Sequence, residues 1–398
     1  MLNDRLSQIG AYPFDRLRAL LGPVQPAPGL EPIALSLGEP RHEPPRMIRD
    51  AILSEHELWG RYPPMRGTDG ARTAIAAWAC RRYRCPETAI DPARNVVPVS
   101  GTREALFMAA LAAVPERKAG GRPVVLMPNP FYQVYLGAAV AAGAEPVCVP
   151  ADAENGFLPD YEGVDPDILA RVALAYFCTP SNPQGAIADL GRLARLVGLA
   201  RRHDFVLVSD ECYSEIYDRG RSPPPGMIEA CLDLGGGLEK VVVFNSLSKR
   251  SSVPGLRVGF AIGDADFMDV YVRLRDHGGA APPMPLLAAA QALLADEEHV
   301  EASRRLYRDK IDIAEELLDG RLGFYRPPGG FYLWLDVGDG EAAARRLWSE
   351  AAVRVLPGCY VARPGEDGDD PGRRYIRVAL VHDRDTAREA LTRLAGVL

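Results

Sequence analysis

The sequence predicts an α/β fold built on a mainly parallel sheet. Between Val96 and Gly263, short apolar runs alternate with longer amphipathic segments. Several of the short runs are almost continuously apolar, which is typical of strands buried on both faces. Strands that alternate with helices in this way predict a parallel sheet covered by helices. The length of 398 residues further predicts a large domain accompanied by a smaller one.

Seven runs qualify as strands of the large domain. They are residues 96–99, 124–127, 146–149, 173–178, 205–209, 241–245 and 258–262. Amphipathic segments between them predict helices at 104–114, 132–142 and 190–202. We therefore expect a seven-stranded sheet with helices between its strands.

The C-terminal part has a different pattern, which predicts a smaller α+β domain. A long helical pattern covers 285–318, followed by a strand at 330–335, a helix at 341–351, a strand at 374–380 and a helix at 383–394. The acidic, glycine-rich segment 364–372 is expected to be an exposed loop. The predicted division is 1–44 as an N-terminal arm and part of the small domain, 45–284 as the large domain, and 285–398 as the small C-terminal domain.

Composition excludes several classes of function. The chain is 47% hydrophobic and 25% charged, with a net charge of −7 and no basic tract, which argues against nucleic acid as a partner. Seven scattered cysteines without a C-x-x-C pair favour a reducing cytoplasm. Six histidines without paired spacing argue against a metal site. Residues 1–20 lack the apolar core of a signal peptide, and no apolar run is long enough to span a membrane.

Lys249 is a candidate Schiff-base lysine. The chain has only 4 lysines among its 46 basic residues, so arginine serves most basic positions. An arginine remains protonated, whereas a lysine amine can lose its proton and form an imine. Lys249 follows the apolar run 241–244 and stands between serines and a glycine-containing turn. The alternative is a solvated surface lysine, which fits Lys118 beside two glycines and is also the expectation for Lys240 and Lys310.

Polar residues gather where the predicted strands end, and this is where open α/β sheets bind ligands. Gly101, Thr102 and Arg103 begin a helix, whose free amides favour a phosphate. A simple helix cap is the alternative. Hydroxyls and a guanidinium that suit a dianionic phosphate come from another strand end: Ser246, Ser248 and Arg257.

Further strand ends supply groups that suit an aromatic heterocycle. Asp210 ends a buried strand and could pair with a protonated ring nitrogen, although a helix cap is an equal alternative. Tyr213 and Asn182 can hydrogen-bond a phenolate oxygen, and Tyr132 can stack on a flat ring or simply pack in the core. Together with Lys249 and the phosphate cradle, these groups describe a site for pyridoxal 5'-phosphate.

The chain resembles the fold-type I, class I/II aminotransferases over almost its full length. The matching segments are SLGEP at 36–40, YP at 62–63 with Gly67, SGTR at 100–103, TPSNPQG at 179–185, DECY at 210–213, SLSK at 246–249, PGLRVG at 254–259 and YIR at 375–377. The resemblance implies a pyridoxal-phosphate-dependent enzyme that acts on amino acids and 2-oxo acids.

The resemblance also implies roles by position. Lys249 forms the Schiff base and shuttles the proton; Asp210 holds the ring nitrogen protonated. Asn182 and Tyr213 bind the phenolate, and Tyr132 stacks on the ring. The implied phosphate ligands are Gly101, Thr102, Ser246, Ser248 and Arg257, and Arg103 is implied as a further cofactor-binding residue. Arg377, assisted by Gly38 and Asn182, binds the substrate carboxylate. Tyr62 reaches the phosphate of the other subunit, which implies a homodimer with shared active sites.

A closer resemblance, to the bacterial succinyldiaminopimelate transaminases of lysine biosynthesis, rests on residues 246–257 and 12–17. It implies transamination between glutamate and N-succinyl-2-amino-6-oxopimelate. The additional carboxylates of that substrate need cations, for which Arg250, Arg273 and Arg275 are candidates. The alternatives are another class I aminotransferase (aspartate, aromatic or alanine type), a pyridoxal-phosphate-dependent C–S lyase or cyclopropane-forming synthase, a cofactor-binding regulatory module, and a structural protein with a vestigial site.

Overall fold

The computed structural model describes residues 3–218, 220–365 and 368–398. Glu366 and Asp367, within the loop predicted at 364–372, lie outside the described residues. The described flanks of that loop, Pro364–Gly365 and Gly368–Asp369, are exposed.

The strands are β1 (Ile33–Ala34), β2 (Val96–Val99), β3 (Val124–Asn129), β4 (Glu145–Pro150), β5 (Val172–Cys178), β6 (Val206–Asp210), β7 (Val241–Ser246), β8 (Gly259–Gly263), β9 (Tyr332–Asp336), β10 (Val353–Arg354), β11 (Leu356–Pro357) and β12 (Tyr375–Ala379). The α-helices are α1 (Pro13–Leu21), α2 (Met47–Ser54), α3 (Asp69–Arg82), α4 (Thr102–Ala113), α5 (Gln133–Ala141), α6 (Pro166–Arg171), α7 (Leu190–Arg202), α8 (Met227–Asp233), α9 (Leu247–Arg250), α10 (Ala265–Gly278), α11 (Met284–Ala295), α12 (Glu298–Leu318), α13 (Gly340–Ala351) and α14 (Arg384–Val397). Short 3-10 helices are η1 (Asp4–Ile9), η2 (His56–Gly60), η3 (Glu87–Ala89), η4 (Pro254–Leu256) and η5 (Gly358–Tyr360).

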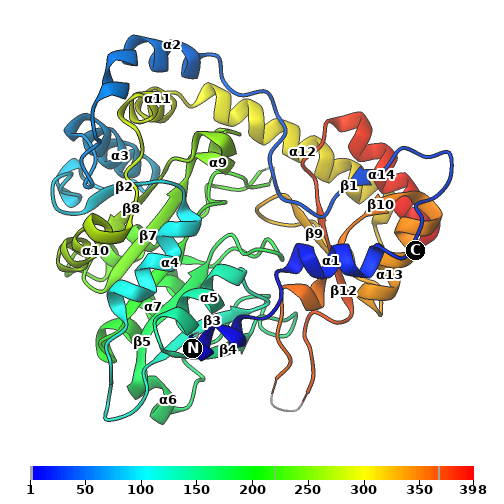
Figure 1. The fold of residues 1–398 in the computed structure, drawn as a ribbon, viewed down its shortest axis with the longest axis horizontal. Helices are drawn as coiled ribbons and strands as arrows, with labels where there is room; N and C mark the ends of the chain where they lie inside the picture. The colour runs from blue at the N-terminus through cyan, green and yellow to red at the C-terminus, as the bar shows by residue number, and fades with distance from the viewer. Residues whose placement is uncertain (1–2, 219, 366–367) are drawn as a thin grey trace.

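The large sheet confirms the predicted α/β fold. Its seven strands lie in the order β2-β8-β7-β6-β5-β3-β4. β8 runs antiparallel to its neighbours β2 and β7, and the other neighbouring pairs are parallel. All seven predicted strands are present, with ends shifted by two residues at most. The parallel arrangement brings the carboxyl ends of β3, β5, β6 and β7 to one edge (Figure 1).

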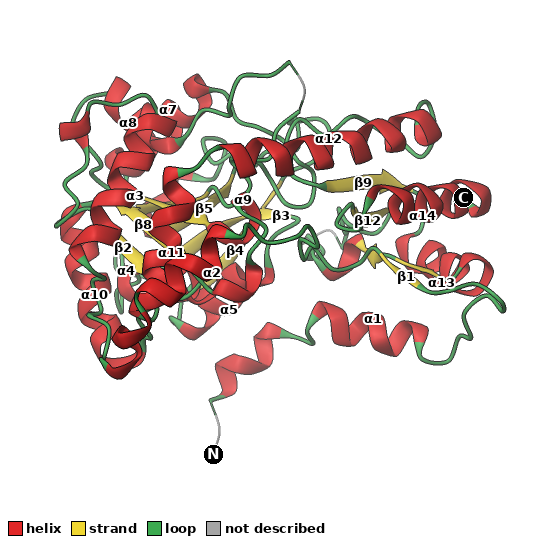
Figure 2. Cartoon of the chain, turned by 90° about the horizontal axis from the view of Figure 1, so that it is seen from above, coloured by secondary structure: helices red, strands yellow, loops and turns green. Residues whose placement is uncertain are grey.

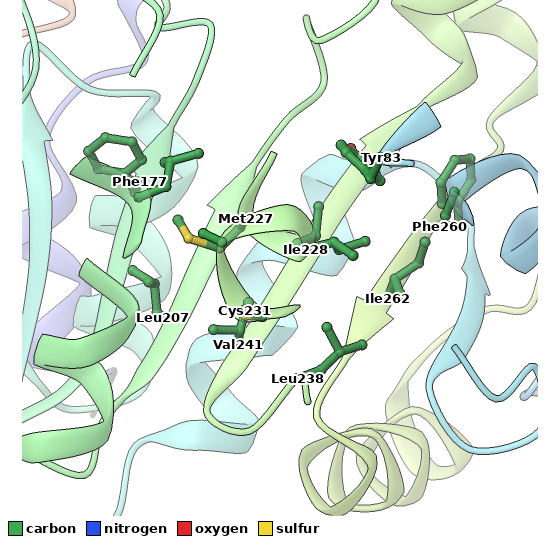
Figure 3. Packing of buried hydrophobic residues seen from close by; sticks show 14 of the residues in the cluster. Tyr83, Phe177, Leu207, Met227, Ile228, Cys231, Leu238, Val241, Phe260 and Ile262 are labelled. Carbon is green, nitrogen blue, oxygen red and sulfur yellow. The ribbon is translucent and has the colours of Figure 1, made fainter. Parts of the chain in front are cut away.

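Both faces of this sheet are covered by helices, as continuous apolar strands require. One core cluster joins α3, α7, α8 and α11 to the sheet, and another joins α4, α5 and α10 to its opposite face. In β7 the side chains alternate between the two clusters, with Val241 and Val243 on the first face and Val242 and Phe244 on the second. Figure 3 shows the first face, where Met227 and Cys231 of α8 approach Leu207 and Val241.

The C-terminal part forms a separate core. β11, β12 and β9 make an antiparallel three-stranded sheet that packs with α12, α13 and α14. β1 pairs in parallel with β10, so the beginning of the chain joins this part. α1 contacts α13, and the long α12 runs from the large sheet to the small one in both views (Figures 1 and 2).

The predicted long helical segment at 285–318 is wrong in one respect, because two helices occupy it. Asp296 has an extended backbone (φ −110°, ψ 130°), which separates α11 from α12. Its carboxylate accepts a hydrogen bond of 3.0 Å from the backbone N–H of His299. Asp296 therefore acts as a capping group that begins a new helix. Among the described residues, no helix has the length and apolar character needed to cross a membrane.

Candidate active site

A cavity of about 550 Å³ lies at the carboxyl edge of the large sheet, between that sheet, the N-terminal segment and the C-terminal part. It brings together twelve of the fourteen predicted site residues. These are Gly38, Thr102, Arg103, Tyr132, Asn182, Asp210, Tyr213, Ser246, Ser248, Lys249, Arg257 and Arg377. Of the other two, Gly101 contacts Arg257 beside the cavity, and Tyr62 lies outside it with a 99% exposed side chain.

Lys249 projects into this cavity from the short helix α9. The helix begins directly after β7, where the Ser246 hydroxyl accepts a hydrogen bond of 3.1 Å from the backbone N–H of Ser248. The Lys249 amine donates a hydrogen bond of 2.5 Å to the carbonyl of Gly38. Burial lowers the pKa of this amine to about 8. About a tenth of the amine is therefore unprotonated at pH 7, far more than for an ordinary lysine, and this neutral form is the one that a nucleophile or base requires.

Asp210 is a buried carboxylate at the end of β6. It accepts hydrogen bonds from the Tyr135 hydroxyl at 2.6 Å and from the backbone N–H of Cys212 at 3.3 Å. Burial raises the pKa of Asp210, although both hydrogen bonds and the charge of Lys249 oppose that rise. A carboxylate in this setting would gain from a cationic partner, such as the protonated nitrogen of a heterocycle.

The start of α4 forms an anion cradle. Gly101 has φ +89°, and a Cβ atom there would overlap the Arg257 guanidinium, so the backbone and this cation are in close contact. Thr102 follows as the first residue of α4 and lines the cavity. The free backbone amides at the N-terminus of this helix therefore lie at the cavity. Ser246 and Ser248, which carry hydroxyls, also line the cavity. This combination suits a dianionic phosphate.

Arg377 lies across the cavity, on β12. Its Nη1 donates to Oδ1 of Asn182 at 3.2 Å, and its Nη2 donates to the carbonyl of Ser36 at 2.8 Å. Its Nε is buried without a hydrogen-bond partner among the described residues. A buried guanidinium that retains an unused donor can bind a carboxylate.

The predicted tyrosines Tyr213 and Tyr132 line the cavity as hydrogen-bonding groups. The hydroxyl of Tyr213 lies 3.1 Å from that of Tyr332, and burial raises the pKa of Tyr213 well above its ordinary value. Tyr213 therefore stays protonated and can donate to an anionic oxygen. The Tyr132 hydroxyl accepts a hydrogen bond of 2.9 Å from Nε of Arg103, which places that guanidinium at the cavity wall.

Sequence reasoning missed three residues of this site. Tyr135 binds Asp210, Tyr332 contacts Tyr213, and the thiol of Cys212 donates a hydrogen bond of 3.3 Å to the Thr102 hydroxyl. All three line the cavity. Tyr135 falls one helical turn after Tyr132, which is the signal that could have identified it, whereas nothing in the strand pattern marks Tyr332.

The candidate cations for a distal carboxylate are wrong. Arg250 is buried and donates to the carbonyls of Leu293 and Asp296, away from the cavity. Arg275 is buried and donates to backbone carbonyls, including that of Pro98. Arg273 is exposed on α10 and does not line the cavity. Charge alone did not reveal that these side chains point elsewhere.

The residues present fit pyridoxal 5'-phosphate. The cavity offers an amine of lowered pKa, a phosphate cradle, a buried carboxylate and a protonated phenol. Among the described residues, no group of three or more histidine, cysteine, aspartate or glutamate side chains is placed to hold a metal ion.

Comparisons with known proteins agree with this chemistry. The family model "Aminotransferase class I and II" matches residues 31–394. An LL-diaminopimelate aminotransferase from Moorella thermoacetica is 31% identical over 99% of this chain and 97% of its own length. The crystal structure of an aminotransferase from Neisseria meningitidis superimposes with a TM-score of 0.93 at 37% identity, covering 99% of each chain. A probable N-succinyldiaminopimelate aminotransferase from Thermus thermophilus has a TM-score of 0.82 at 26% identity, covering 96% of this chain and 98% of its own.

Proposed function

Because the chain belongs to the class I and II aminotransferases, which depend on pyridoxal phosphate, we propose that it transfers an amino group from glutamate to N-succinyl-2-amino-6-oxopimelate. One observation carries the proposal: the Lys249 amine of lowered pKa and the Arg377 guanidinium with its unused Nε line the same cavity. This arrangement suits an α-amino or 2-oxo acid, whose carboxylate and reacting carbon are adjacent.

The proposed mechanism assigns each group one task. Pyridoxal phosphate, when bound, supplies a carbonyl that binds amino groups and a ring that accepts an electron pair from the substrate's α-carbon. Lys249 would accept the proton that this carbon loses and would serve as the proton donor afterwards. Arg377 and Asn182 bind the α-carboxylate and fix the orientation of the substrate. Asp210 pairs with the ring nitrogen, and Tyr213 donates to the phenolate.

The cations of the cavity support an acceptor with a distal carboxylate. Arg103, Arg257 and Arg377 line it. Arg257 contacts Gly101 in the phosphate cradle, and Arg377 is paired with Asn182. For Arg103, whose Nε donates to Tyr132, we propose a second substrate carboxylate as the partner in place of the cofactor phosphate. Apolar side chains of the lining suit the aliphatic part of such a substrate: Pro13, Phe14, Leu37, Leu356 and Val361.

A second candidate is the unsuccinylated acceptor, because the Moorella relative is an LL-diaminopimelate aminotransferase. The Thermus neighbour, described as acting on the succinylated compound, supports the first candidate. The two acceptors differ by a succinyl group. The enzyme can therefore distinguish them only by the space and the charge that it offers to that group.

The test is a spectroscopic half-reaction on the purified holoenzyme. Addition of glutamate should move the cofactor band from roughly 360–430 nm to about 330 nm, and the true acceptor should restore it. Restoration by N-succinyl-2-amino-6-oxopimelate supports the first candidate. Restoration of the band only by tetrahydrodipicolinate, the cyclised form of the unsuccinylated acceptor, supports the second candidate. Restoration only by other 2-oxo acids contradicts both candidates. Continuous breakdown of an amino acid in the absence of any 2-oxo acid acceptor would instead indicate a lyase.

The assembly and domain division are proposed on the same basis. We propose a homodimer in which Tyr62 contacts the partner's site, since tyrosine is enriched at protein interfaces and this one is fully exposed in the single chain. The proposed domains are 1–44 with 285–398, and 45–284. In support, β2 to β8 fall within 45–284, while β1 pairs with β10.

A further inference from the structure

We propose that Tyr332 is a positioning residue that aligns Tyr213 and Arg377 with the segment that anchors Lys249. The inference rests on the proposed function, because it concerns groups that bind the cofactor and the substrate carboxylate. Tyr332 would act through these neighbours rather than on the reacting atoms. Two parts of the side chain, the hydroxyl and the ring, would have separable effects.

The position of Tyr332 brings three parts of the site together. It is the first residue of β9, is only 4% exposed, and pairs with Ala379 of β12. Its hydroxyl lies 3.1 Å from that of Tyr213, which follows β6 of the large sheet. The Arg377 guanidinium lies 4.5 Å from the centre of its ring. One side chain therefore contacts groups held by both sheets.

The third contact is with Gly38. A Cβ atom at this position would overlap the Tyr332 hydroxyl, so the hydroxyl packs directly against the Gly38 backbone. The carbonyl of Gly38 accepts the hydrogen bond from the Lys249 amine. The absence of a side chain at residue 38 is what allows Tyr332 to approach the anchor of Lys249.

The hydroxyl would determine how strongly Tyr213 donates. When an anionic oxygen lies in front of Tyr213, its proton points to that oxygen, and the Tyr332 hydroxyl can donate to Tyr213 from behind. Consecutive hydrogen bonds of this kind polarise and strengthen each other. Removing the Tyr332 hydroxyl should therefore weaken stabilisation of the phenolate by Tyr213.

The ring would act on Arg377. A guanidinium over the face of a tyrosine ring gains a cation–π interaction, which is stronger when water is excluded. The Nη atoms of Arg377 donate to Asn182 and Ser36, and the Tyr332 ring covers a face of the guanidinium, so these contacts together define its orientation while Nε stays unpartnered among the described residues. Loss of the ring should therefore weaken carboxylate binding, whereas loss of the hydroxyl alone should not.

The variants Tyr332→Phe and Tyr332→Leu separate these effects in the holoenzyme. Tyr271→Phe is the matched control, because Tyr271 is a buried tyrosine that donates one hydrogen bond of 3.2 Å to the carbonyl of Ala105 and does not line the cavity. Two measurements do not require turnover. One is the midpoint pH at which the absorption of the bound cofactor changes, and the other is the dissociation constant of succinate, a non-reacting dicarboxylate.

Tyr332→Phe should raise the pH midpoint by roughly half a unit, since phenolate stabilisation favours the deprotonated form, and leave succinate binding within about twofold. Tyr332→Leu should also weaken succinate binding about fivefold. The inference about Tyr332 is overturned if folded Tyr332→Phe keeps the wild-type pH midpoint, or if folded Tyr332→Leu binds succinate as the wild type does. Neither outcome would contradict the proposed function. A wild-type protein whose cofactor band does not respond to glutamate would instead overturn the proposed function.

Discussion

The hydroxyl of Tyr135 donates a hydrogen bond of 2.6 Å to Oδ2 of Asp210, and both side chains are buried. The Tyr135 ring is in turn stacked on Tyr176, with the centroids 4.4 Å apart. The aspartate is thus held by a neutral donor whose own position is fixed by the core of the large sheet. This bond opposes the effect of burial, which raises the pKa of Asp210.

Tyr135→Phe should therefore reduce the charged fraction of Asp210. Without the hydroxyl, the pKa of the carboxyl rises further, and pairing with a protonated ring nitrogen weakens. A hydrogen bond to a charged group is worth about 1.5–3 kcal/mol, so we expect cofactor affinity to fall by roughly tenfold or more. Fluorescence titration of the apoenzyme with pyridoxal phosphate measures this.

The matched control is Tyr176→Phe, which removes a buried hydroxyl that donates to the carbonyl of Leu106 at 2.7 Å. It keeps the stacked ring and should change cofactor affinity by no more than about twofold. Equal losses in the two variants would show that the hydrogen bond from Tyr135 to Asp210 has no specific effect on cofactor binding.

Gly101→Ala should weaken cofactor binding through the position of Arg257. The new Cβ atom would overlap the guanidinium, and φ at residue 101 is +89°. Gly120→Ala is the matched control, because its φ of +75° imposes similar strain while no atom lies within 4 Å of the new Cβ. Both variants should lose about 1 kcal/mol of stability from strain. Only Gly101→Ala should lose cofactor affinity, by roughly tenfold, in equilibrium dialysis.

The large sheet was predictable because its strands are buried on both faces and carry continuous apolar runs. Residues 241–245 illustrate this, since every strand residue of β7 is buried. The direction of β8 was not predictable, because apolar periodicity does not record whether a strand runs parallel or antiparallel to its neighbours. The polar residues at strand ends could be grouped in advance, since parallel strands share one carboxyl edge.

The residues that support the site were harder to predict than the site residues that belong to recognisable sequence motifs. Tyr332 acquires its contacts only when β9 is brought against the large sheet, and no local pattern encodes that approach. Arg250 shows the opposite error. It follows Lys249 directly, yet its guanidinium turns towards α11, where the carbonyl of Leu293 accepts its hydrogen bond at 2.8 Å. Sequence distance is a poor guide to side-chain direction on a helix.

The pKa of Lys249 predicts how cofactor uptake depends on pH. Burial lowers this pKa to about 8, and only the neutral amine attacks a carbonyl. The rate at which apoenzyme forms its covalent link should rise about tenfold per pH unit below 8 and level off above it, as followed by stopped-flow absorbance. Lys249→Arg keeps the positive charge, but it should show no such phase and no turnover at any pH. Near-normal turnover in that variant would remove Lys249 from its proposed role.

Lys310 should make the folded state more stable as the pH rises. The expectation of a surface lysine is wrong here, because this side chain is 1% exposed. Its amine contacts Nε2 of His42 at 3.0 Å and the carbonyl of His382 at 2.9 Å. Burial lowers the pKa of Lys310 from its ordinary 10.5 to about 7, although the charge of Asp383 opposes this. Between these two pH values the unfolded chain binds a proton that the folded chain has released, so the free energy of unfolding increases with pH.

Lys310→Met should abolish that increase. Relative to this variant, the wild type should gain roughly 3 kcal/mol of unfolding free energy between pH 7 and pH 10, measured by urea denaturation at fixed protein concentration. The charge of Lys310 also lowers the pKa values of His42 and His382, but burial is the main cause in both, so the two imidazoles are neutral in this window in either protein. The remaining titrating groups are common to the two proteins and cancel. Lys240→Met is the control: the hydrogen bond to Asp204 raises the pKa of Lys240, so the wild type should show no such gain over it in this window. Parallel pH profiles for wild type and Lys310→Met would show that the buried amine keeps its proton, with His42 and His382 compensating for its burial.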